Sequence, residues 1–411
     1  MQIAIMGFGT IGSGVAEVLL KNNKSIVERS GHESLGIKYI LDIRDFPDHE
    51  LAHCFTKNFD DILNDTEVGI VVECMGGTKP AYEYVSKSLA AGKSVVSSNK
   101  ELVAAHGCEL LKLAKENNVN FLFEASVGGG IPIIRPISQC LAANEITEIA
   151  GILNGTTNFI LTKMIEEGMS FDDALKLAQE NGYAERDPSA DILGHDAARK
   201  ICILASLCFG KHVYPDAVET TGITEITSAD VDYAKSWGGV IKLIGRAEKI
   251  DDNSIFTTVG PCLIGNHSQL ASVTDVFNAI LVRGNAIGDV VFYGKGAGKL
   301  PTASAVVADV IDCAKHTEKR KAFGWSDAVD NYVKSPDLQE NALYVRAFTN
   351  DYENAVAQIN KAFESAVILE RDNAQNGEIA FVTPKAVEKD VRAAIASLPI
   401  DVKSVLRVLD Y

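Results

Sequence analysis

The sequence predicts three folded parts, and each is indicated by a different pattern of apolar residues. Residues 1–135 alternate short apolar runs with helical stretches, which predicts an α/β domain with a mostly parallel sheet. Residues 136–316 combine longer apolar strands with amphipathic helices, which predicts a second, α+β domain. Residues 342–411 follow the order βαββαβ, the split-βαβ arrangement of ferredoxin-like folds. The polar, irregular residues 317–341 are expected to form a linker before this last part.

The individual elements follow from the same patterns. The first domain is expected to have strands at 2–6, 37–41, 68–73, 94–97 and 120–124. Its crossover helices are expected to include 12–22 and 80–91. Strands of the second domain are expected at 145–153 and 255–264. A helix over 301–316, with Pro301 at its start, is predicted to return and pack on the first domain.

Composition narrows the classes of function. The 411 residues include 39 Lys and Arg against 55 Asp and Glu, a net charge of −16, which argues against nucleic acid and membrane partners. Eight cysteines without a C-x-x-C pair favour a reducing compartment and no structural zinc. The first six residues lead directly into a glycine turn, so neither a leader peptide nor a membrane span is expected. A cytoplasmic protein is therefore predicted.

A glycine turn follows the first strand and opens the first helix, which is the context that gives a G-x-G-x-x-G string its meaning. Its glycines permit the tight turn, the close approach of a pyrophosphate, and the packing of helix on strand. The amide groups at the helix N-terminus are then left to hold the anion. A Rossmann-type dinucleotide site is thus predicted at Gly7, Phe8, Gly9, Thr10, Ile11 and Gly12.

The end of the second strand bears on which nicotinamide cofactor is bound. Asp42 there would bind the ribose 2′-hydroxyl of NAD, whereas Arg44 would pair with the 2′-phosphate of NADP. Asp42 lies 30 residues past Gly12, further than the usual spacing, and Lys57 could add a second positive charge. The balance favours NADP slightly over NAD, and use of both stays open.

The second domain holds a polar loop that runs into a largely apolar helix. The loop carries Glu185 and Asp191, and the helix places Asp196 and Lys200 four residues apart on one face. A surface ion pair is one interpretation. The helix continues as an almost entirely apolar stretch, 201–208, which favours instead a lysine enclosed in a cleft and held by carboxylates. Upstream, the string N-G-T-T-N at 154–158 sits where a strand ends and a helix begins, so Thr157 or Asn158 could cap that helix.

Together these motifs resemble those of the homoserine dehydrogenase family, from the glycine turn to the helix after Pro301. The resemblance rests on G-F-G-T-I-G, S-N-K at 98–100, E-A-S-V-G-G-G-I-P at 124–132, N-G-T-T-N-F-I-L, G-Y-A-E-x-D-P-x-x-D-x-x-G-x-D-A-A-x-K and G-x-G-A-G-x-x-P-T-A-S-A. It implies reversible, NAD(P)-dependent oxidation of L-homoserine to L-aspartate 4-semialdehyde in the biosynthesis of threonine and methionine. It also implies that residues 136–316 bind substrate, carry out catalysis and form a dimer.

The resemblance implies roles for individual residues. A hydride transfer at C4 of the substrate needs a proton donor and acceptor at the same oxygen, and Lys200 matches the family's catalytic lysine, with Lys100 as the second candidate. Glu185 and Asp191 would meet the substrate ammonium, and Asp196 would orient the amino acid or Lys200. The remaining implied contacts are Thr156 to the substrate, and Ser97, Lys100 and Gly296 to the cofactor.

Three consecutive glycines at 128–130 suit a backbone reversal, and a flexible turn is the plain interpretation of this segment. The resemblance implies a site for a monovalent cation such as Na⁺, because oxygen ligands suit a hard cation. Its ligands would be the main-chain carbonyl groups of Glu124, Val127, Gly129 and Ile131.

The C-terminal βαββαβ unit resembles the ACT domain that many members of the family carry for feedback by an amino acid such as threonine. The turn after its first strand reads Asn350-Asp351-Tyr352-Glu353-Asn354 in place of the usual D-K-P-G, without the glycine that lets a ligand approach the backbone. The unit is therefore expected either to bind an effector or to serve mainly as an interface. A homodimer or homotetramer is expected.

Two other functions are compatible with the predicted fold. One is a non-catalytic regulator that binds nucleotide and amino acid, which the loss of Lys100 or Lys200 would have favoured. The other is a related NAD(P)-dependent enzyme that acts on a different hydroxy amino acid, because fold alone does not set the substrate. The string from Glu185 to Lys200 favours homoserine.

Overall fold

The computed structural model describes residues 1–318 and 320–411, so the predicted linker 317–341 includes one residue, 319, outside the described residues. The chain divides into two compact units, each built from three segments. Unit 1 comprises Met1–Glu145, Cys202–Pro215 and Gly294–Asp330. Unit 2 comprises Ile146–Ile201, Asp216–Tyr293 and Asn331–Tyr411. Helix α9 (His195–Phe209) contributes residues to both units.

Unit 1 is built on a six-stranded sheet in the order β3-β2-β1-β4-β5-β6, in which every neighbouring pair is parallel. Its strands are β1 (Gln2–Met6), β2 (Gly36–Leu41), β3 (Phe55–Thr56), β4 (Val68–Glu73), β5 (Ser94–Ser97) and β6 (Phe121–Leu122). Its helices are α1 (Thr10–Lys21), α2 (Asn23–Ser30), α3 (Phe59–Leu63), α4 (Ala81–Ala90), α5 (Lys100–Glu116) and α11 (Lys299–Lys315). The predicted parallel sheet is confirmed. Because the strand order reverses between β1 and β4, the carboxyl edge of these two strands is the crevice where such sheets bind ligands.

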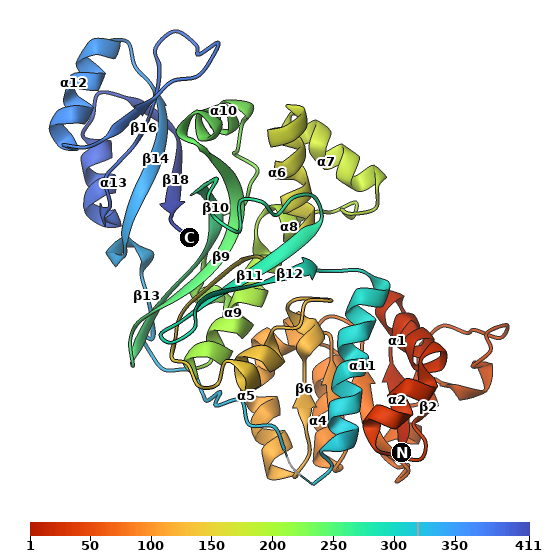
Figure 1. Cartoon of the computed structure of the whole chain (residues 1–411). Helices are drawn as coiled ribbons and strands as arrows, with labels where there is room; N and C mark the ends of the chain where they lie inside the picture. Colours follow the sequence, from red (N-terminus) through yellow and green to blue (C-terminus); the bar gives the residue numbers. More distant parts are fainter. Residues whose placement is uncertain (319) are drawn as a thin grey trace. The chain divides into compact units, whose positions relative to one another are not determined.

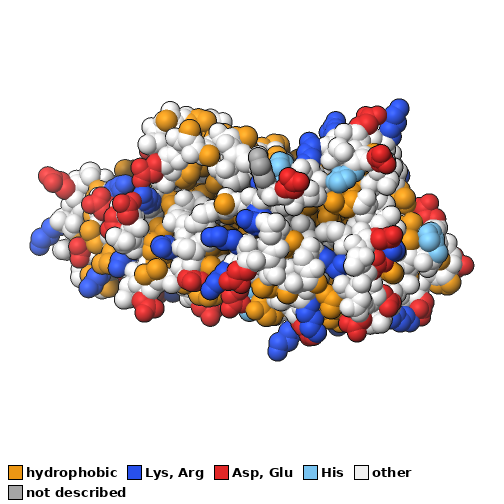
Figure 2. Space-filling view, turned by 90° about the horizontal axis from the view of Figure 1, so that it is seen from below, with side chains coloured by type: hydrophobic (Ala, Val, Ile, Leu, Met, Phe, Trp, Pro, Cys, Tyr) orange, Lys and Arg blue, Asp and Glu red, His pale blue; other side chains and the backbone are white. Residues whose placement is uncertain are grey.

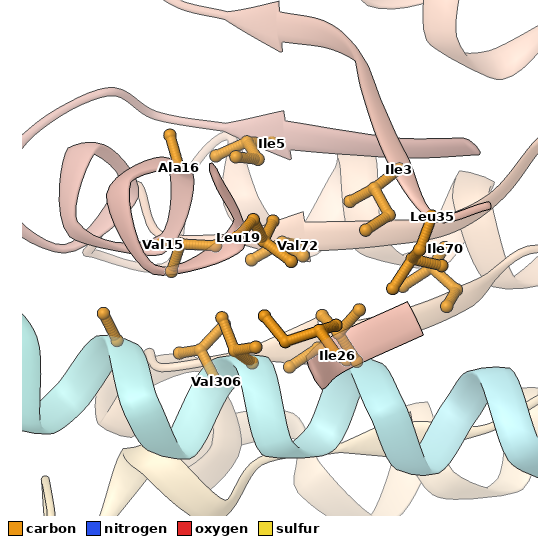
Figure 3. Close-up of a cluster of buried hydrophobic side chains, with 14 of the residues drawn as sticks. Ile3, Ile5, Val15, Ala16, Leu19, Ile26, Leu35, Ile70, Val72 and Val306 are labelled. Atoms are coloured by element: carbon orange, nitrogen blue, oxygen red, sulfur yellow. The ribbon is translucent and has the colours of Figure 1, made fainter. Parts of the chain in front are cut away.

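The core of unit 1 brings together residues that are far apart in the sequence (Figure 3). Alternate residues of β1 and β4, such as Ile5 and Val72, point toward α1, where Val15 and Leu19 face them. Val306 of α11 lies against the same cluster and is fully buried. Helix α11 lies beside α1 (Figure 1), and the absence of a side chain on Gly14 allows Lys299 and Ala303 of α11 to approach it closely. Burial of this cluster attaches α11, which comes late in the sequence, to the part of the sheet formed by β1 and β4.

Unit 2 contains a long mixed sheet whose main path runs β12-β11-β7-β9-β10-β18-β14-β16-β15. The strands of its first part are β7 (Ile146–Ile152), β9 (Gly239–Asp251), β10 (Ser254–Gly265), β11 (Phe277–Gly284) and β12 (Gly288–Lys295), with the short β8 (Glu219–Thr220) and β13 (Val333–Lys334) beside β10. The helices of this part are α6 (Gly155–Glu167), α7 (Phe171–Glu180), α8 (Ser189–Ile192) and α10 (Ser228–Trp237). Strands β9 and β10 form a long hairpin in the middle of this sheet and pair with each other over almost their whole length.

The C-terminal segment has the predicted βαββαβ order, with one additional two-residue strand before its second helix. It contains β14 (Glu340–Phe348), α12 (Tyr352–Ala362), β15 (Val367–Leu369), β16 (Glu378–Val382), the short β17 (Ala386–Val387), α13 (Glu388–Ala396) and β18 (Asp401–Leu409). The strand order β18-β14-β16-β15 places the last strand beside the first. Strand β18 also pairs in parallel with β10, where Leu263 is registered with Val408, so the C-terminal strands continue the sheet of unit 2. One edge of the C-terminal sheet is thereby occupied within the chain itself.

The surface carries both acidic and basic side chains (Figure 2), in keeping with the charged residues of the sequence. Acidic and basic side chains are interspersed over the face of the molecule in Figure 2. Within residues 1–318 and 320–411, no helix combines the length and the apolar character needed to cross a lipid bilayer.

Candidate active site

The glycine turn lies at the carboxyl edge of unit 1, between β1 and α1. Gly7 adopts a left-handed φ of 91°, and a side chain there would collide with the main chain of Cys74 and Met75, which follow β4. A side chain on Gly12 would overlap the carbonyl oxygen of Gly7. Gly9, by contrast, borders open space and precedes the first turn of α1. The turn therefore fits a pyrophosphate held by the amide groups at the start of α1.

Asp42 and Arg44 form one connected group with the glycine turn. The main-chain amide of Phe8 donates to Asp42 Oδ2 at 2.7 Å, and Arg44 donates to both carboxylate oxygens of Asp42 at 3.0 Å. Arg44 also donates to the carbonyl oxygen of Phe8 and lies over the ring of Phe46. The hydrogen bond from Arg44 is the main reason that the pKa of Asp42 is lowered to about 2. An ionised aspartate, whose charge is compensated by Arg44, and a half-exposed guanidinium therefore lie beside the turn.

Ser97 and Lys100 lie at the same edge, around the end of β5. Ser97 is fully buried, and its hydroxyl donates to Glu73 at the end of β4. Lys100 is the first residue of α5, and Asn99 caps that helix by accepting a hydrogen bond from the amide of Leu102 at 3.1 Å. The sequence patterns placed Lys100 here, but they did not identify Glu73 or Asn99.

In unit 2, a buried polar cluster forms where β7 ends and α6 begins. Lys200 donates to Asp196 Oδ2 at 2.8 Å and to the carbonyl oxygen of Leu153 at 2.7 Å. The side-chain amide of Asn154 donates to Asp191 at 2.7 Å and to Asp196 at 2.8 Å. The side chains of Lys200 and Asp196 are 9% and 4% exposed, so their ion pair is buried rather than a solvated surface pair. The structure thus brings together three of the predicted site residues.

The other two predicted substrate contacts have different surroundings. Thr156 lies in the first turn of α6, and its hydroxyl donates to the carbonyl oxygen of Tyr183 at 2.7 Å. Glu185 is exposed, and no hydrogen bond within the described part of the chain joins its carboxylate to the buried cluster.

The expected helix cap is wrong by a few residues. Asn154, and neither Thr157 nor Asn158, caps α6, because its side-chain oxygen accepts from the amide of Thr157 at 2.9 Å. Asn158 instead donates to three carbonyl groups of the segment 273–277. The position of Asn154 directly after an apolar strand was the signal that could have identified the cap.

The predicted cation loop is buried and tightly folded. Ile131 closes a turn by donating to the carbonyl oxygen of Gly128 at 2.8 Å, and Gly129 adopts a left-handed φ of 55°. No hydrogen bond within residues 1–318 and 320–411 uses the carbonyl oxygens of Val127, Gly129 or Ile131. The carboxylate of Glu124 is occupied by the amides of residues 133–135, so only its main chain can contribute a ligand. These oxygens are compatible with a hard monovalent cation.

Gly296 packs on this loop, because a side chain on Gly129 would overlap its carbonyl oxygen, and Gly130 donates to the neighbouring Lys295. The segment around Gly296, the predicted cofactor contact, therefore lies against the cation loop. In the part of the chain that the structure describes, no group of three or more His, Cys, Asp or Glu side chains is arranged to hold a metal ion.

Comparisons with known proteins identify the family. Residues 7–124 match the model of the homoserine dehydrogenase NAD-binding domain, and residues 132–311 match the model of homoserine dehydrogenase. The homoserine dehydrogenase of Neisseria gonorrhoeae is 38% identical over 97% of this chain and 95% of its own length. That of Bacillus subtilis is 36% identical over 97% and 94%.

The chain belongs to the homoserine dehydrogenase family. A crystal structure of homoserine dehydrogenase from Thiobacillus denitrificans superposes with a TM-score of 0.88 at 36% identity and covers 100% of this chain and 98% of its own. A hyperthermophilic archaeal homoserine dehydrogenase, solved in complex with NADPH, has a TM-score of 0.63 at 30% identity and covers 76% and 97%. The chain is thus an NAD(P)-dependent oxidoreductase that acts on a CH–OH group and interconverts L-homoserine and L-aspartate 4-semialdehyde.

Proposed function

We propose that Lys200 carries the proton in homoserine oxidation, that Asp191 and Asp196 hold the amino acid, and that NADP is the preferred cofactor. The observation that supports this assignment best is the buried pair of Lys200 and Asp196, tied to Asp191 through Asn154. A buried lysine beside two carboxylates offers both a proton carrier and a place for the α-ammonium group of an amino acid.

The chemistry of the step sets what Lys200 must do. Oxidation of homoserine breaks the O–H and C4–H bonds of the alcohol, so one proton and one hydride leave and a carbonyl group forms. A bound nicotinamide cofactor would supply the acceptor for the hydride. The amine of Lys200 takes the hydroxyl proton, and in the reverse direction its ammonium returns it. The carbonyl oxygen of Leu153 and the carboxylate of Asp196 accept hydrogen bonds from the Lys200 nitrogen, which orients it.

Other predicted contacts complete the proposal. Lys100 is the second proton carrier or electrostatic partner, because it starts α5 at the carboxyl edge where the cofactor binds. Thr156 contributes to the substrate pocket near the start of α6, and exposed Glu185 reaches the substrate ammonium from the loop before α8. The cofactor contacts Gly7–Gly12, the main chain of Ser97, and Gly296.

Arg44 supports the preference for NADP. Arg44 already forms an ion pair with Asp42, which would otherwise accept the ribose 2′-hydroxyl of NAD. The side chain of Arg44 is 56% exposed. A 2′-phosphate can replace Asp42 as its partner with a charge-assisted, bidentate contact.

Initial rates of nicotinamide reduction with L-homoserine test this proposal. We expect a higher kcat/KM with NADP than with NAD, and L-aspartate 4-semialdehyde as the product. A higher value with NAD would reverse the assignment of Arg44. The same assay in sodium and in choline salts tests the cation loop, because only sodium can occupy a site formed by the carbonyl groups of Val127, Gly129 and Ile131.

The C-terminal unit is proposed to be ACT-like. Its βαββαβ order and its strand order support this, but Asp351 is already used to cap α12 through the amide of Asn354. Strand β18 is paired with β10 on one side of the C-terminal sheet. Strand β15, on the other side of that sheet, is therefore the edge that we propose for pairing with a second copy. Rates measured with added L-threonine, and sedimentation with and without it, test the effector and the expected homodimer or homotetramer.

The cytoplasmic location stays a prediction, supported by eight cysteines that all have free thiols.

A further inference from the structure

A buried glutamate ends the strand next to the one that leads to Lys100. Glu73 is the last residue of β4, is 0% exposed, and is registered with Ser97 on β5. Its carboxyl group accepts hydrogen bonds from the hydroxyl of Ser97 at 2.6 Å and the amide of Met75 at 2.8 Å, with a longer contact from the side chain of Asn99 at 3.4 Å. One donor at the end of β5 and two donors from the turns after β4 and β5 therefore converge on one side chain.

These contacts join the two turns that follow neighbouring strands. The main-chain amide of Asn99 donates to the same Ser97 hydroxyl at 3.0 Å, and the side-chain amide of Asn99 donates to the carbonyl oxygen of Gly77 at 2.6 Å. Gly76 and Gly77 both adopt left-handed φ values, 80° and 68°. Because glycine is conformationally permissive, the hydrogen bond from Asn99 helps to fix the turn after β4. Through Asn99, Glu73 thus fixes both this turn and the start of α5.

The position of Glu73 is costly, which argues that it has a use. No ion pair among the described residues involves Glu73, so neutral donors alone stabilise its carboxyl group. Burial raises the pKa of Glu73, while the hydrogen bonds from Ser97 and Met75 lower it. A buried acid without a cation costs stability, and an apolar side chain in this strand would avoid that cost.

We propose that Glu73 is a positioning residue for Lys100, acting through Ser97 and Asn99. Asn99 is both the partner of Glu73 and the N-cap of α5, and Lys100 is the next residue. A shift of Asn99 therefore changes the direction in which the Lys100 side chain leaves the helix. This inference rests on the proposed role of Lys100 in the reaction.

Steady-state kinetics of Glu73→Ala and Glu73→Gln test the proposal. We expect Glu73→Ala to lower kcat by about 10- to 100-fold, the loss typical of a misplaced catalytic group, with little change in KM or in the dissociation constant of NADP. Glu73→Gln keeps the acceptor for Met75 and Asn99, so it should recover most of kcat. Ser88→Ala, which removes a different buried hydroxyl of unit 1, is the matched control and should leave kcat unchanged.

Two further variants show whether Glu73 acts through Lys100. In a Lys100→Ala background, Glu73→Ala should not lower the residual kcat further, because the group that it positions is absent. Asn99→Asp keeps the helix cap but places a second acid beside Glu73, so it should lower kcat even if Glu73→Ala does not fold. Wild-type kcat in both Glu73→Ala and Asn99→Asp, or the same loss with and without Lys100, would overturn the inference. If Lys100→Ala alone keeps full kcat, the proposed role of Lys100 fails, and that result is separate from any effect of Glu73.

Discussion

Lys100 in unit 1 and Lys200 in unit 2 each lie near an asparagine that caps a helix, but their electrostatic settings differ. Each lies next to an asparagine N-cap, because Lys100 follows Asn99 directly and Lys200 donates to the carbonyl group of the residue before Asn154. Both asparagines use the side-chain oxygen to cap a helix and the side-chain nitrogen to reach a buried carboxylate. One short side chain thus connects the start of a helix to an acid from elsewhere in the chain.

The two acids differ in what compensates their charge. Glu73 accepts hydrogen bonds from neutral donors, whereas Asp196 has Lys200 as a paired cation. In unit 1 the acid fixes the geometry of two turns, and in unit 2 the acid and the lysine stabilise each other. The same arrangement of an asparagine side chain therefore serves orientation in one unit and charge pairing in the other.

The largest expected effect is that of Lys200→Ala. It should lower kcat by about 1,000-fold or more, because general acid–base catalysis contributes about 10²- to 10⁴-fold. It should also lower stability, since Asp196 would be buried without its cation. Stopped-flow rates, together with NADP binding measured by calorimetry to show that the fold is kept, check this expectation. The control is Lys163→Ala, which removes a lysine of α6 that pairs with Glu167. Near-normal turnover of Lys200→Ala would contradict the assignment of the proton carrier.

Lys242 shows what happens to a buried lysine whose hydrogen bonds, among the described residues, go to neutral oxygens instead of a carboxylate. Lys242 is 1% exposed and donates to the carbonyl oxygen of Val273 and the side-chain oxygen of Asn158, and burial lowers its pKa to about 8. Since its pKa is lower in the folded than in the unfolded chain, the unfolded state binds more protons between about pH 8 and 10.5, and stability rises with pH in that window.

The free energy of unfolding of the wild type should therefore increase relative to that of Lys242→Met over this range, by about 3 kcal/mol at most. Denaturant titrations at several pH values measure the difference. Val240→Ala, on the same strand, removes packing without a titrating group and should differ from the wild type by a constant amount. If Lys242→Met also differs from the wild type by a constant amount, the pKa of Lys242 is not lowered in the folded protein. Neutral oxygens would then stabilise the charged lysine as effectively as a carboxylate.

Much of the fold, and the local parts of the site, could be predicted from the sequence. The glycine turn and the pair of Asp196 and Lys200 are encoded within a few residues, so a spacing rule finds them. The contacts of Asn154 span 37 and 42 residues, and Glu73 ends a strand whose pattern is otherwise apolar. No local period links such residues, because only the parallel alignment of β4 and β5 places Glu73 beside Ser97. The pairing of β18 with β10 is likewise a long-range property.

A smaller effect is expected at Arg44, which lies beside the glycine turn and takes no part in the proton transfer. Arg44→Ala should lower kcat/KM for NADP by about 10- to 100-fold, since a hydrogen bond to a charged group contributes about 1.5–3 kcal/mol. The value for NAD should hold or rise, because Asp42 loses its present partner and can accept from the ribose. Rates with both cofactors measure the ratio, and Lys21→Ala, on the surface of α1, is the control. An unchanged ratio would mean that unit 1 selects its cofactor without this charge.

The smallest changes, Asn99→Ser and Asn154→Ser, separate capping from bridging in the two units. Serine is a good N-cap, so both helices should keep their starts, but neither variant has an amide nitrogen to reach a carboxylate. Each change should cost about 1 kcal/mol, the net contribution of an ordinary hydrogen bond. In Asn154→Ser the cost should appear as a higher KM for homoserine, because Asp191 loses the donor that fixes it while Lys200 still holds Asp196. In Asn99→Ser it should appear in kcat, because the start of α5 loses its tie to the carbonyl oxygen of Gly77. The same kinetic parameter changing in both variants would mean that the two asparagines have one function, and that the paired cation in unit 2 makes no difference to it.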